Sequence, residues 1–275
     1  MILAKAFLKY PILRGLTPIY HGVLKGKMKP SFFIVGFQKC GTTTLYNAMV
    51  SHPDILPGLM KENNILAEPR ERFEDFALCF PKKQKGKITG DASHLHTWMP
   101  YGLSRIKTHY PNAKIIVIMR NPVDRAFSHF NMDQKIGYVS KSISFQQLID
   151  VELTLRKRLS DEAGMPEIYD SLKLYGNKYG WPISRGLYHI YIEELQRLNL
   201  DFLPLFIEEA NENWEETMVR TFEFIGVKPV HVSPKMSNKG EYKSNLDPKI
   251  RKQLEDFYEL PNQKLASLLQ RTLPW

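Results

Sequence analysis

The sequence predicts a single-domain α/β fold, with a P-loop-like parallel β-sheet flanked by helices on both faces. Two apolar runs rich in β-branched and aromatic residues, Ser31–Phe37 and Lys114–Met119, have the composition of buried parallel strands. The first run leads into a glycine turn, and apolar residues at helical spacing follow between positions 45 and 50. This order of strand, glycine turn and helix is typical of the start of a nucleotide-binding α/β unit.

Strands and helices continue to alternate along the rest of the chain. We expect strands at 87–91 and 202–207, and helices at 42–51, 101–110, 122–135, 186–198, 214–225, 249–258 and 262–269. Asn121 and Pro122 mark the start of the 122–135 helix, because Asn is a favoured N-cap and Pro a favoured first-turn residue. Residues 137–185 mix helical stretches with a segment rich in Gly, Pro and Tyr, and we interpret them as an insertion that shapes a substrate pocket.

The 275 residues are expected to form one domain, 31–275, preceded by an amphipathic arm at 1–30. Lysines, an arginine and prolines interrupt the apolar residues of the arm, whereas a membrane-spanning helix needs about 20 nearly continuous apolar residues. The arm is therefore expected to pack on the domain or to make a peripheral, reversible membrane contact. Two cysteines, Cys40 and Cys79, suit a reducing compartment, so we expect a cytoplasmic protein.

The formal net charge of +9 indicates a partner that is an anion. Phosphorylated small molecules, an anionic membrane and nucleic acid all meet this condition. The basic residues are spread through the chain instead of clustering along one helix or alternating with aromatic residues, which disfavours a nucleic-acid-binding protein.

The residues that follow the first predicted strand have the composition of a phosphate-binding loop. Gly36 and Gly41 keep the glycine spacing of the P-loop motif G-x-x-x-x-G-K-[ST], but Thr42 occupies the position of its lysine, and Lys39 lies inside the loop. Backbone N–H groups of such a turn, together with those of the first helical turn, form an anion site. The loop therefore predicts phosphate binding of a kind that differs from that of P-loop NTPases.

Arg120 lies at the end of the Lys114–Met119 strand, where an NTPase would carry a magnesium-binding aspartate. A cation at this position repels a metal ion and attracts a second phosphate, to which a guanidinium can donate two parallel hydrogen bonds. Ser128 lies on the second turn of the next predicted helix and can donate its hydroxyl to the same group. The sequence thus favours a doubly phosphorylated nucleotide bound without a metal ion.

These residues carry a resemblance to a known family. FIVGFQKCGTTTL resembles the 5′-phosphosulfate loop of sulfotransferases that use 3′-phosphoadenosine 5′-phosphosulfate, and KIIVIMRNPVDRAFSHF resembles their 3′-phosphate motif. GLYHIYIEEL and SNKGEYKSNLDPKIRKQL are also similar to the family, so the likeness covers roughly residues 31–132 and 184–270. The resemblance implies that the donor, and the product 3′-phosphoadenosine 5′-phosphate, are bound without a metal by Lys39, Cys40, Gly41, Thr42, Thr43, Thr44, Arg120, Ser128, Lys239 and Gly240.

The resemblance also implies the catalytic groups of sulfuryl transfer. Lys39 is expected to stabilise the charge of the leaving phosphate. Glu62, in Lys61-Glu62-Asn63-Asn64, matches the general base of heparan-sulfate-type and bacterial sulfotransferases. His94 and His96 are the rival bases, because other branches of the family use histidine and the two side chains would share one face if the segment is extended.

The sequence does not distinguish between several acceptors: a hydroxyl group of a carbohydrate, a lipid or a small metabolite, or an amine. Ala92 replaces a lysine of the heparan-sulfate enzymes, which disfavours a heavily sulfated polysaccharide. The alternative function is that of a nucleotide-dependent kinase or other phosphotransferase with a degenerate P-loop. Such an enzyme should need Mg²⁺, and Arg120 occupies the position where its aspartate would be.

Overall fold

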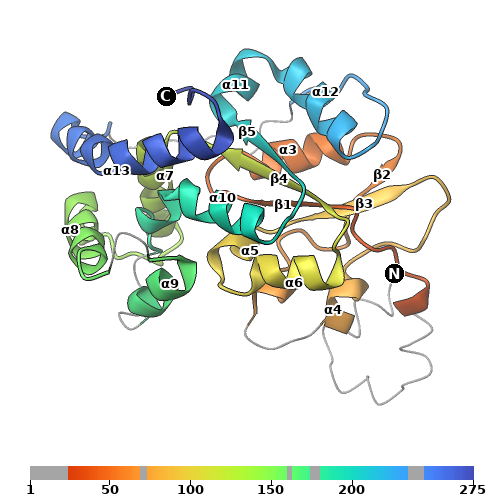
Figure 1. Ribbon diagram of the computed structural model, residues 1–275, viewed down its shortest axis with the longest axis horizontal. Helices are drawn as coiled ribbons and strands as arrows, with labels where there is room; N and C mark the ends of the chain where they lie inside the picture. Colours follow the sequence, from red (N-terminus) through yellow and green to blue (C-terminus); the bar gives the residue numbers. More distant parts are fainter. Residues whose placement is uncertain (1–23, 69–72, 160–162, 174–179, 235–244) are drawn as a thin grey trace.

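A computed structural model shows a parallel β-sheet of five strands with helices on both faces (Figure 1). The structure describes residues 24–68, 73–159, 163–173, 180–234 and 245–275. The strand order is β2-β3-β1-β4-β5, and every neighbouring pair is parallel. The strands are β1 (Phe32–Gly36), β2 (Ile55–Leu56), β3 (Ile88–Ala92), β4 (Lys114–Met119) and β5 (Phe202–Phe206).

The two apolar runs of the sequence form the centre of this sheet. All five residues of β1 are buried, as are five of the six residues of β4, because helices cover both faces of these strands. The β1 and β4 strands pair in register from Phe32 opposite Lys114 to Ile34 opposite Ile116. Their carboxyl ends therefore lie side by side at one edge of the sheet, which is where parallel α/β sheets bind ligands.

Helices cover the sheet on two sides. In Figure 1, α3 (Thr42–Met49), α11 (Ile207–Glu212) and α12 (Trp214–Phe224) lie on one side, and α5 (Leu95–Trp98), α6 (Gly102–His109) and α10 (Tyr188–Arg197) on the other. The short helical segments η2 (Ile65–Ala67) and α4 (Phe73–Leu78) lie between β2 and β3 in the chain.

Further helices lie beside the sheet, next to the carboxyl end of β4 (Figure 1). They are α7 (Pro122–Lys135), α8 (Phe145–Arg156), α9 (Met165–Lys173), η4 (Ser184–Gly186) and α13 (Pro248–Leu269). The α8 and α9 helices belong to the predicted insertion, and α13 packs along α10 and contacts α7. Glu152 of α8 accepts hydrogen bonds from the backbone N–H groups of Ile183 and Ser184, at 3.0 and 2.8 Å, which anchors the insertion to η4.

The local sequence signals predict most of the element bounds. The β4 strand and α7 have the predicted bounds, and Asn121 caps α7 by accepting from the N–H groups of Val123 and Asp124. The prediction of two helices at 249–258 and 262–269 is wrong, because α13 is continuous through Pro261. Leu254, Tyr258 and Leu265, all at most 1% exposed, lie on one face of α13, and their burial outweighs the backbone hydrogen bond that a proline removes.

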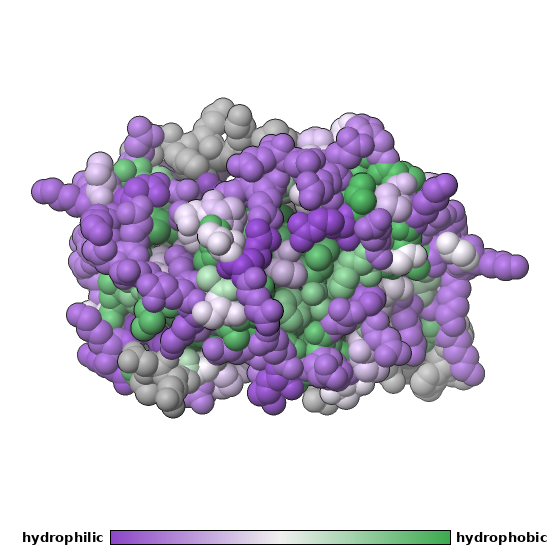
Figure 2. All heavy atoms as spheres, turned by 45° about the horizontal axis from the view of Figure 1, so that its top comes forward, coloured by the Kyte–Doolittle hydropathy of each residue, from purple (hydrophilic) through white to green (hydrophobic). Residues whose placement is uncertain are grey.

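The described part of the arm, residues 24–30, packs against the segment that follows α4. The Lys27 ammonium donates to the Phe80 carbonyl oxygen at 2.6 Å, and the Met28 N–H donates to that of Pro81 at 2.9 Å. Within the described part of the chain, no helix combines the length and the apolar character needed to cross a bilayer. Most of the face in Figure 2 is hydrophilic, with hydrophobic side chains gathered near its centre between hydrophilic ridges.

Candidate active site

The predicted phosphate loop joins the carboxyl end of β1 to the amino end of α3. Gly41 is the N-cap residue of α3 with φ of 87°, in the left-handed region, and no side chain caps the helix at this end. The first N–H groups of an α-helix lack intrahelical acceptors, so those of Thr42, Thr43 and Thr44 are available to an anion. Lys39 also has a positive φ, of 73°, and its side chain is partly exposed.

Arg120 lies beside this loop, as the sequence predicts for residues that follow neighbouring parallel strands. Its Nη1 atom lies 3.4 Å from the Lys39 carbonyl oxygen, and the Phe37 N–H donates to the Ile118 carbonyl oxygen at 2.7 Å. The Tyr188 hydroxyl donates to the Arg120 carbonyl oxygen at 2.9 Å and fixes the backbone at the end of β4. Among the described residues no carboxylate forms an ion pair with Arg120, so its guanidinium can take an anionic ligand.

Segment 61–64 brings Glu62 to the amino end of α3. The Lys61 ammonium donates to Thr43 Oγ1 at 2.6 Å and to Glu62 Oε1 at 3.0 Å, so one lysine links the loop threonine to the carboxylate. The Glu62 side chain is 41% exposed and thus reachable by an acceptor from solvent. Lys61 is not among the residues that the sequence predicts at the site; its position directly before Glu62 is the local signal for it.

The neighbouring residue Asn63 anchors this segment to β3. Asn63 Nδ2 donates to Asp91 Oδ1 at 2.6 Å, and Asp91 Oδ2 lies 3.5 Å from His96 Nδ1. Burial raises the pKa of Asp91 to about 7 and lowers that of His96 to about 3. His96 is fully buried, so it supports the β3 end from inside and is not exposed to an acceptor.

The expectation that His94 and His96 share one face of an extended segment is wrong. The β3 strand ends at Ala92, His94 is the N-cap residue of α5, and His96 lies inside that helix. Only His94 is partly exposed. Burial, followed by the positive charges of Arg185, His96 and Lys61, lowers the pKa of His94 to about 3. A base with so low a pKa accepts a proton poorly near neutral pH, so this environment disfavours His94 as the general base.

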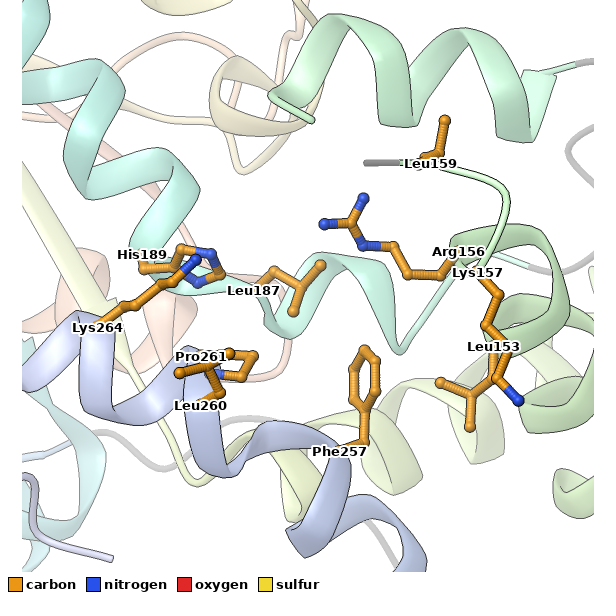
Figure 3. Close-up of a pocket in the computed structure, with 10 residues that line it drawn as sticks. All are labelled: Leu153, Arg156, Lys157, Leu159, Leu187, His189, Phe257, Leu260, Pro261 and Lys264. Atoms are coloured by element: carbon orange, nitrogen blue, oxygen red, sulfur yellow. The ribbon is translucent and has the colours of Figure 1, made fainter. Parts of the chain in front are cut away.

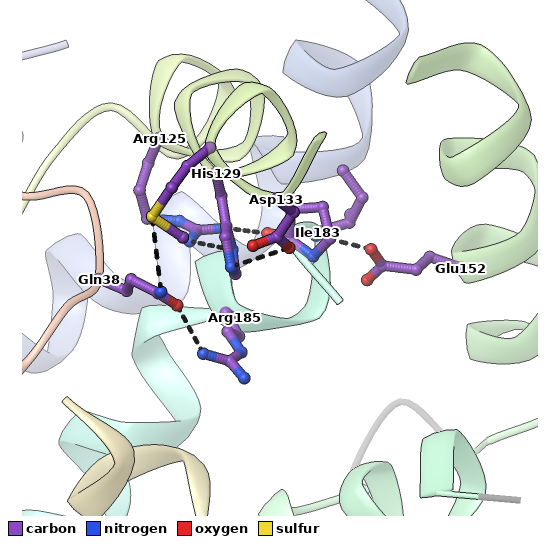
Figure 4. A network of polar contacts seen from close by, with 9 residues as sticks. Gln38, Arg125, His129, Asp133, Glu152, Ile183 and Arg185 are labelled. Atoms are coloured by element: carbon purple, nitrogen blue, oxygen red, sulfur yellow. Dashed lines mark hydrogen bonds and ion pairs between the residues drawn. The ribbon is translucent and has the colours of Figure 1, made fainter. Parts of the chain in front are cut away.

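A buried polar network supports the loop from the side of α7 and η4 (Figure 4). Arg185 Nη1 donates to Gln38 Oε1 at 2.7 Å, and the Arg185 guanidinium stacks over the Trp98 ring at 4.6 Å. Burial lowers the pKa of Arg185 to about 10, so the side chain stays charged at neutral pH. Arg185 therefore brings a fourth cation, after Lys39, Arg120 and Lys61, close to the loop.

Arg125, unlike Arg185, does not face the loop residue Gln38. Arg125 is fully buried, donates to the Pro182 carbonyl oxygen and lies 3.4 Å from His129 Nδ1 through Nη1. His129 Nε2 lies 3.4 Å from Asp133 Oδ2 on the next turn of α7. Figure 4 shows these side chains side by side below α7, so Arg125 ties α7 to the start of η4.

The remaining predicted ligands of the nucleotide fall into three groups. The Cys40 side chain is buried, and the backbone N–H of Cys40 donates to the Phe37 carbonyl oxygen at 3.1 Å. This residue therefore shapes the loop from inside. Ser128 lies in α7 and is 2% exposed. Lys239 and Gly240 lie outside the described residues. In the part of the chain that the structure describes, no cluster of three His, Cys, Asp or Glu side chains could hold a metal ion.

Comparisons with known proteins agree on one family. The model of the sulfotransferase domain matches residues 29–245. Human carbohydrate sulfotransferase 15 is 25% identical over 87% of this chain and 53% of its own length. A bifunctional heparan sulfate N-deacetylase/N-sulfotransferase 1 from Caenorhabditis briggsae is 23% identical over 89% of this chain and 30% of its own. The chain thus spans about half, or less, of the length of these curated relatives.

A solved structure shows the same fold. The sulfotransferase from Alicyclobacillus acidocaldarius superposes with a TM-score of 0.58 and 24% sequence identity, over 89% of this chain and 97% of that one. The parallel sheet and its flanking helices therefore follow a known sulfotransferase architecture. Because the domain model covers most of the chain, this protein belongs to the sulfotransferase family.

Proposed function

We propose that this protein transfers a sulfuryl group from 3′-phosphoadenosine 5′-phosphosulfate to a hydroxyl or amine of a carbohydrate, lipid or small-metabolite acceptor. The observation that carries the proposal is the meeting of three chain segments at one edge of the sheet. The loop after β1, Arg120 after β4, and Glu62 through Lys61 and Thr43 all gather around the amino end of α3. This arrangement joins an anion site to a partly exposed carboxylate.

The donor would be held at both of its phosphate ends. The N–H groups of Thr42–Thr44 would bind the 5′-phosphosulfate, and Lys39 would stabilise negative charge on the leaving oxygen. Arg120 and Ser128 would bind the 3′-phosphate, with Lys239 and Gly240 closing that end. Positive groups alone suffice for this binding, so we propose a transfer that does not need a metal ion.

In the proposed step, the acceptor oxygen or nitrogen attacks the sulfur in line with the bond to the 5′-phosphate. The new bond to sulfur forms as the sulfur–oxygen bond breaks, and the electron pair of that bond leaves on the phosphate of 3′-phosphoadenosine 5′-phosphate. Glu62 takes the acceptor proton. Lys61 holds Glu62 at 3.0 Å and Thr43 at 2.6 Å, so the base is positioned relative to the loop before the acceptor arrives.

The first experiment tests the donor. Thermal-shift titrations in EDTA with 3′-phosphoadenosine 5′-phosphate should raise Tm, because a ligand that binds only the folded state stabilises it. ATP with Mg²⁺ should produce the larger shift if the protein is a kinase with a degenerate P-loop. A shift with ATP–Mg²⁺ and none with the bisphosphate would refute the proposal.

The second experiment tests the base and the acceptor. With ³⁵S-labelled donor, carbohydrate, lipid and small-metabolite acceptors are screened for label transfer by wild type, Glu62→Gln and His94→Gln. Glu62→Gln should lose transfer while keeping the Tm shift with the bisphosphate, and His94→Gln should retain transfer. Glu212→Gln is the matched control, because Glu212 is an exposed carboxylate at the end of α11. Transfer by Glu62→Gln at the wild-type rate would reassign the base.

A further inference from the structure

A cavity of about 390 Å³ lies between α8, α10 and α13 (Figure 3). Its volume falls in the range of small-molecule sites, about 300–1,000 Å³. The apolar part of its wall includes Leu153 at α8, Leu187 before α10, and Phe257 and Leu260 on α13. Leu260 is one of the few large hydrophobic side chains that is largely exposed, at 56%. Such a lining suits a hydrocarbon group.

The polar part of the wall is entirely basic. Arg156, Lys157, Lys264 and His189 line the cavity, and among its described lining residues there is no Asp or Glu. In Figure 3, the side chains of Arg156 and Lys264 extend into the space between the helices, and His189 lies beside Lys264. Cations that line an apolar space favour binding of an anionic group.

His189 adds a buried polar atom to this wall. The residue is 6% exposed, and its Nδ1 atom has no hydrogen-bond partner. Burial, followed by the charges of Lys264 and Arg156, lowers its pKa to about 4, so the ring is neutral near pH 7. A neutral imidazole with its proton on Nδ1 can donate to an anionic oxygen, which would satisfy this atom.

The cavity is separate from the candidate active site. Phe37 of the phosphate loop packs against Tyr188 and Tyr191 of α10, with ring centroids 4.5 and 4.8 Å apart. Positions 188 and 191 share one face of the helix, whereas position 189 lies about 100° away around the axis. The loop and the cavity therefore contact different faces of α10.

We propose that this cavity is a second ligand site, which binds a small amphipathic anion. The hydrocarbon chain of the ligand lies against Leu187, Phe257 and Leu260. Its single anionic head group lies between Lys264 and His189. A carboxylate and a sulfate ester share this chemistry, and titration of both separates a fatty acid from an alkyl sulfate.

The test is isothermal titration calorimetry of the full chain with decanoate, decyl sulfate and the neutral decyl maltoside, each below its micellar concentration. At least one of the two anions should bind, and the maltoside should bind at least about tenfold more weakly. Lys264→Gln should weaken anion binding by about tenfold, and the exposed Leu260→Asp should abolish it without unfolding the protein. Lys249→Gln is the matched control, because it removes an exposed charge from α13 outside the cavity.

Saturating 3′-phosphoadenosine 5′-phosphate should leave anion binding unchanged, since the two sites lie on different faces of α10. Three results would overturn the inference: equal affinity for the maltoside, unchanged binding in Lys264→Gln, or displacement of the anion by the bisphosphate. None of these binding measurements depends on sulfuryl transfer, so they test the second site separately from the proposed function.

Discussion

Gly41→Ala tests whether close packing against Ile207 explains why the N-cap residue of α3 is a glycine. Gly41 has φ of 87°, and a Cβ atom built on it would lie 2.7 Å from Ile207 Cδ1, closer than side chains normally pack. The left-handed conformation costs an L-residue roughly 1–2 kcal/mol. Overpacking adds at most about 1 kcal/mol, because the clashing atom is the end of the partly exposed Ile207 side chain, which can shift. We therefore expect the free energy of unfolding to fall by about 1–3 kcal/mol, as measured by urea denaturation.

Two further variants separate the two contributions. Gly86→Ala is the control for conformation alone, because Gly86 has φ of 73° and its added Cβ would meet nothing within 4 Å. Ile207→Val removes Cδ1, after which the nearest Ile207 atom to the new Cβ is Cγ1, at 3.6 Å. The double variant Gly41→Ala/Ile207→Val should therefore regain the packing part, giving a coupling free energy of about 0.5–1 kcal/mol in a double-mutant cycle.

The binding of 3′-phosphoadenosine 5′-phosphate in the same samples supplies a second readout. Affinity should fall in Gly41→Ala, whose altered residue is the N-cap of α3, and stay unchanged in Gly86→Ala. If Gly41→Ala costs no more than Gly86→Ala and shows no coupling with Ile207→Val, packing against α11 does not explain the glycine.

Three other predictions concern charge. Lys39→Ala should lower turnover by at least about tenfold with little change in Tm, because this partly exposed loop lysine contributes little to the core; unchanged turnover in a ³⁵S assay would remove it from the mechanism. Glu152→Gln should lower the free energy of unfolding by about 1–3 kcal/mol, measured by urea denaturation, because its amide N–H₂ would face donors at Ser184. The pKa of His96 is about 3, so an unfolded chain takes up a proton below pH 6.5 that the folded protein excludes, and stability falls as pH drops. His96→Asn should therefore reduce the loss of stability between pH 6.5 and 5 by about 1.6 kcal/mol, since the slope approaches 1.36 kcal/mol per pH unit only below the unfolded pKa. Urea titrations at both pH values measure this loss, and an unchanged loss would refute the buried neutral state.

The pairing of β1 with β4 confirmed that the phosphate loop and Arg120 lie at the same edge of the sheet. This was predictable because the apolar run of each strand is a local signal. The apolar runs at Phe32–Gly36 and Lys114–Met119 are buried and adjacent, so the residues after them meet at the same edge. Capping chemistry likewise predicted the start of α7 at Pro122, since Asn121 and Pro122 act on their immediate neighbours.

The sequence failed where distant residues decide the outcome. Pro261 reads as a helix end, yet burial of Leu254, Tyr258 and Leu265 keeps α13 continuous. The two histidines after β3 read as a matched pair, yet the turn into α5 buries His96 and leaves only His94 partly exposed. In both cases packing between elements overrides the local preference.

By itself, the sequence determined the α/β class and the residues that follow the two central strands, because strand burial and helix capping depend on neighbouring positions. Only the tertiary structure decided that Lys61 bridges Thr43 and Glu62, that Arg185 reaches Gln38, and that α8, α10 and α13 enclose a basic cavity. These contacts join residues many positions apart, and their distances follow from how helices pack on the sheet, which no local pattern encodes.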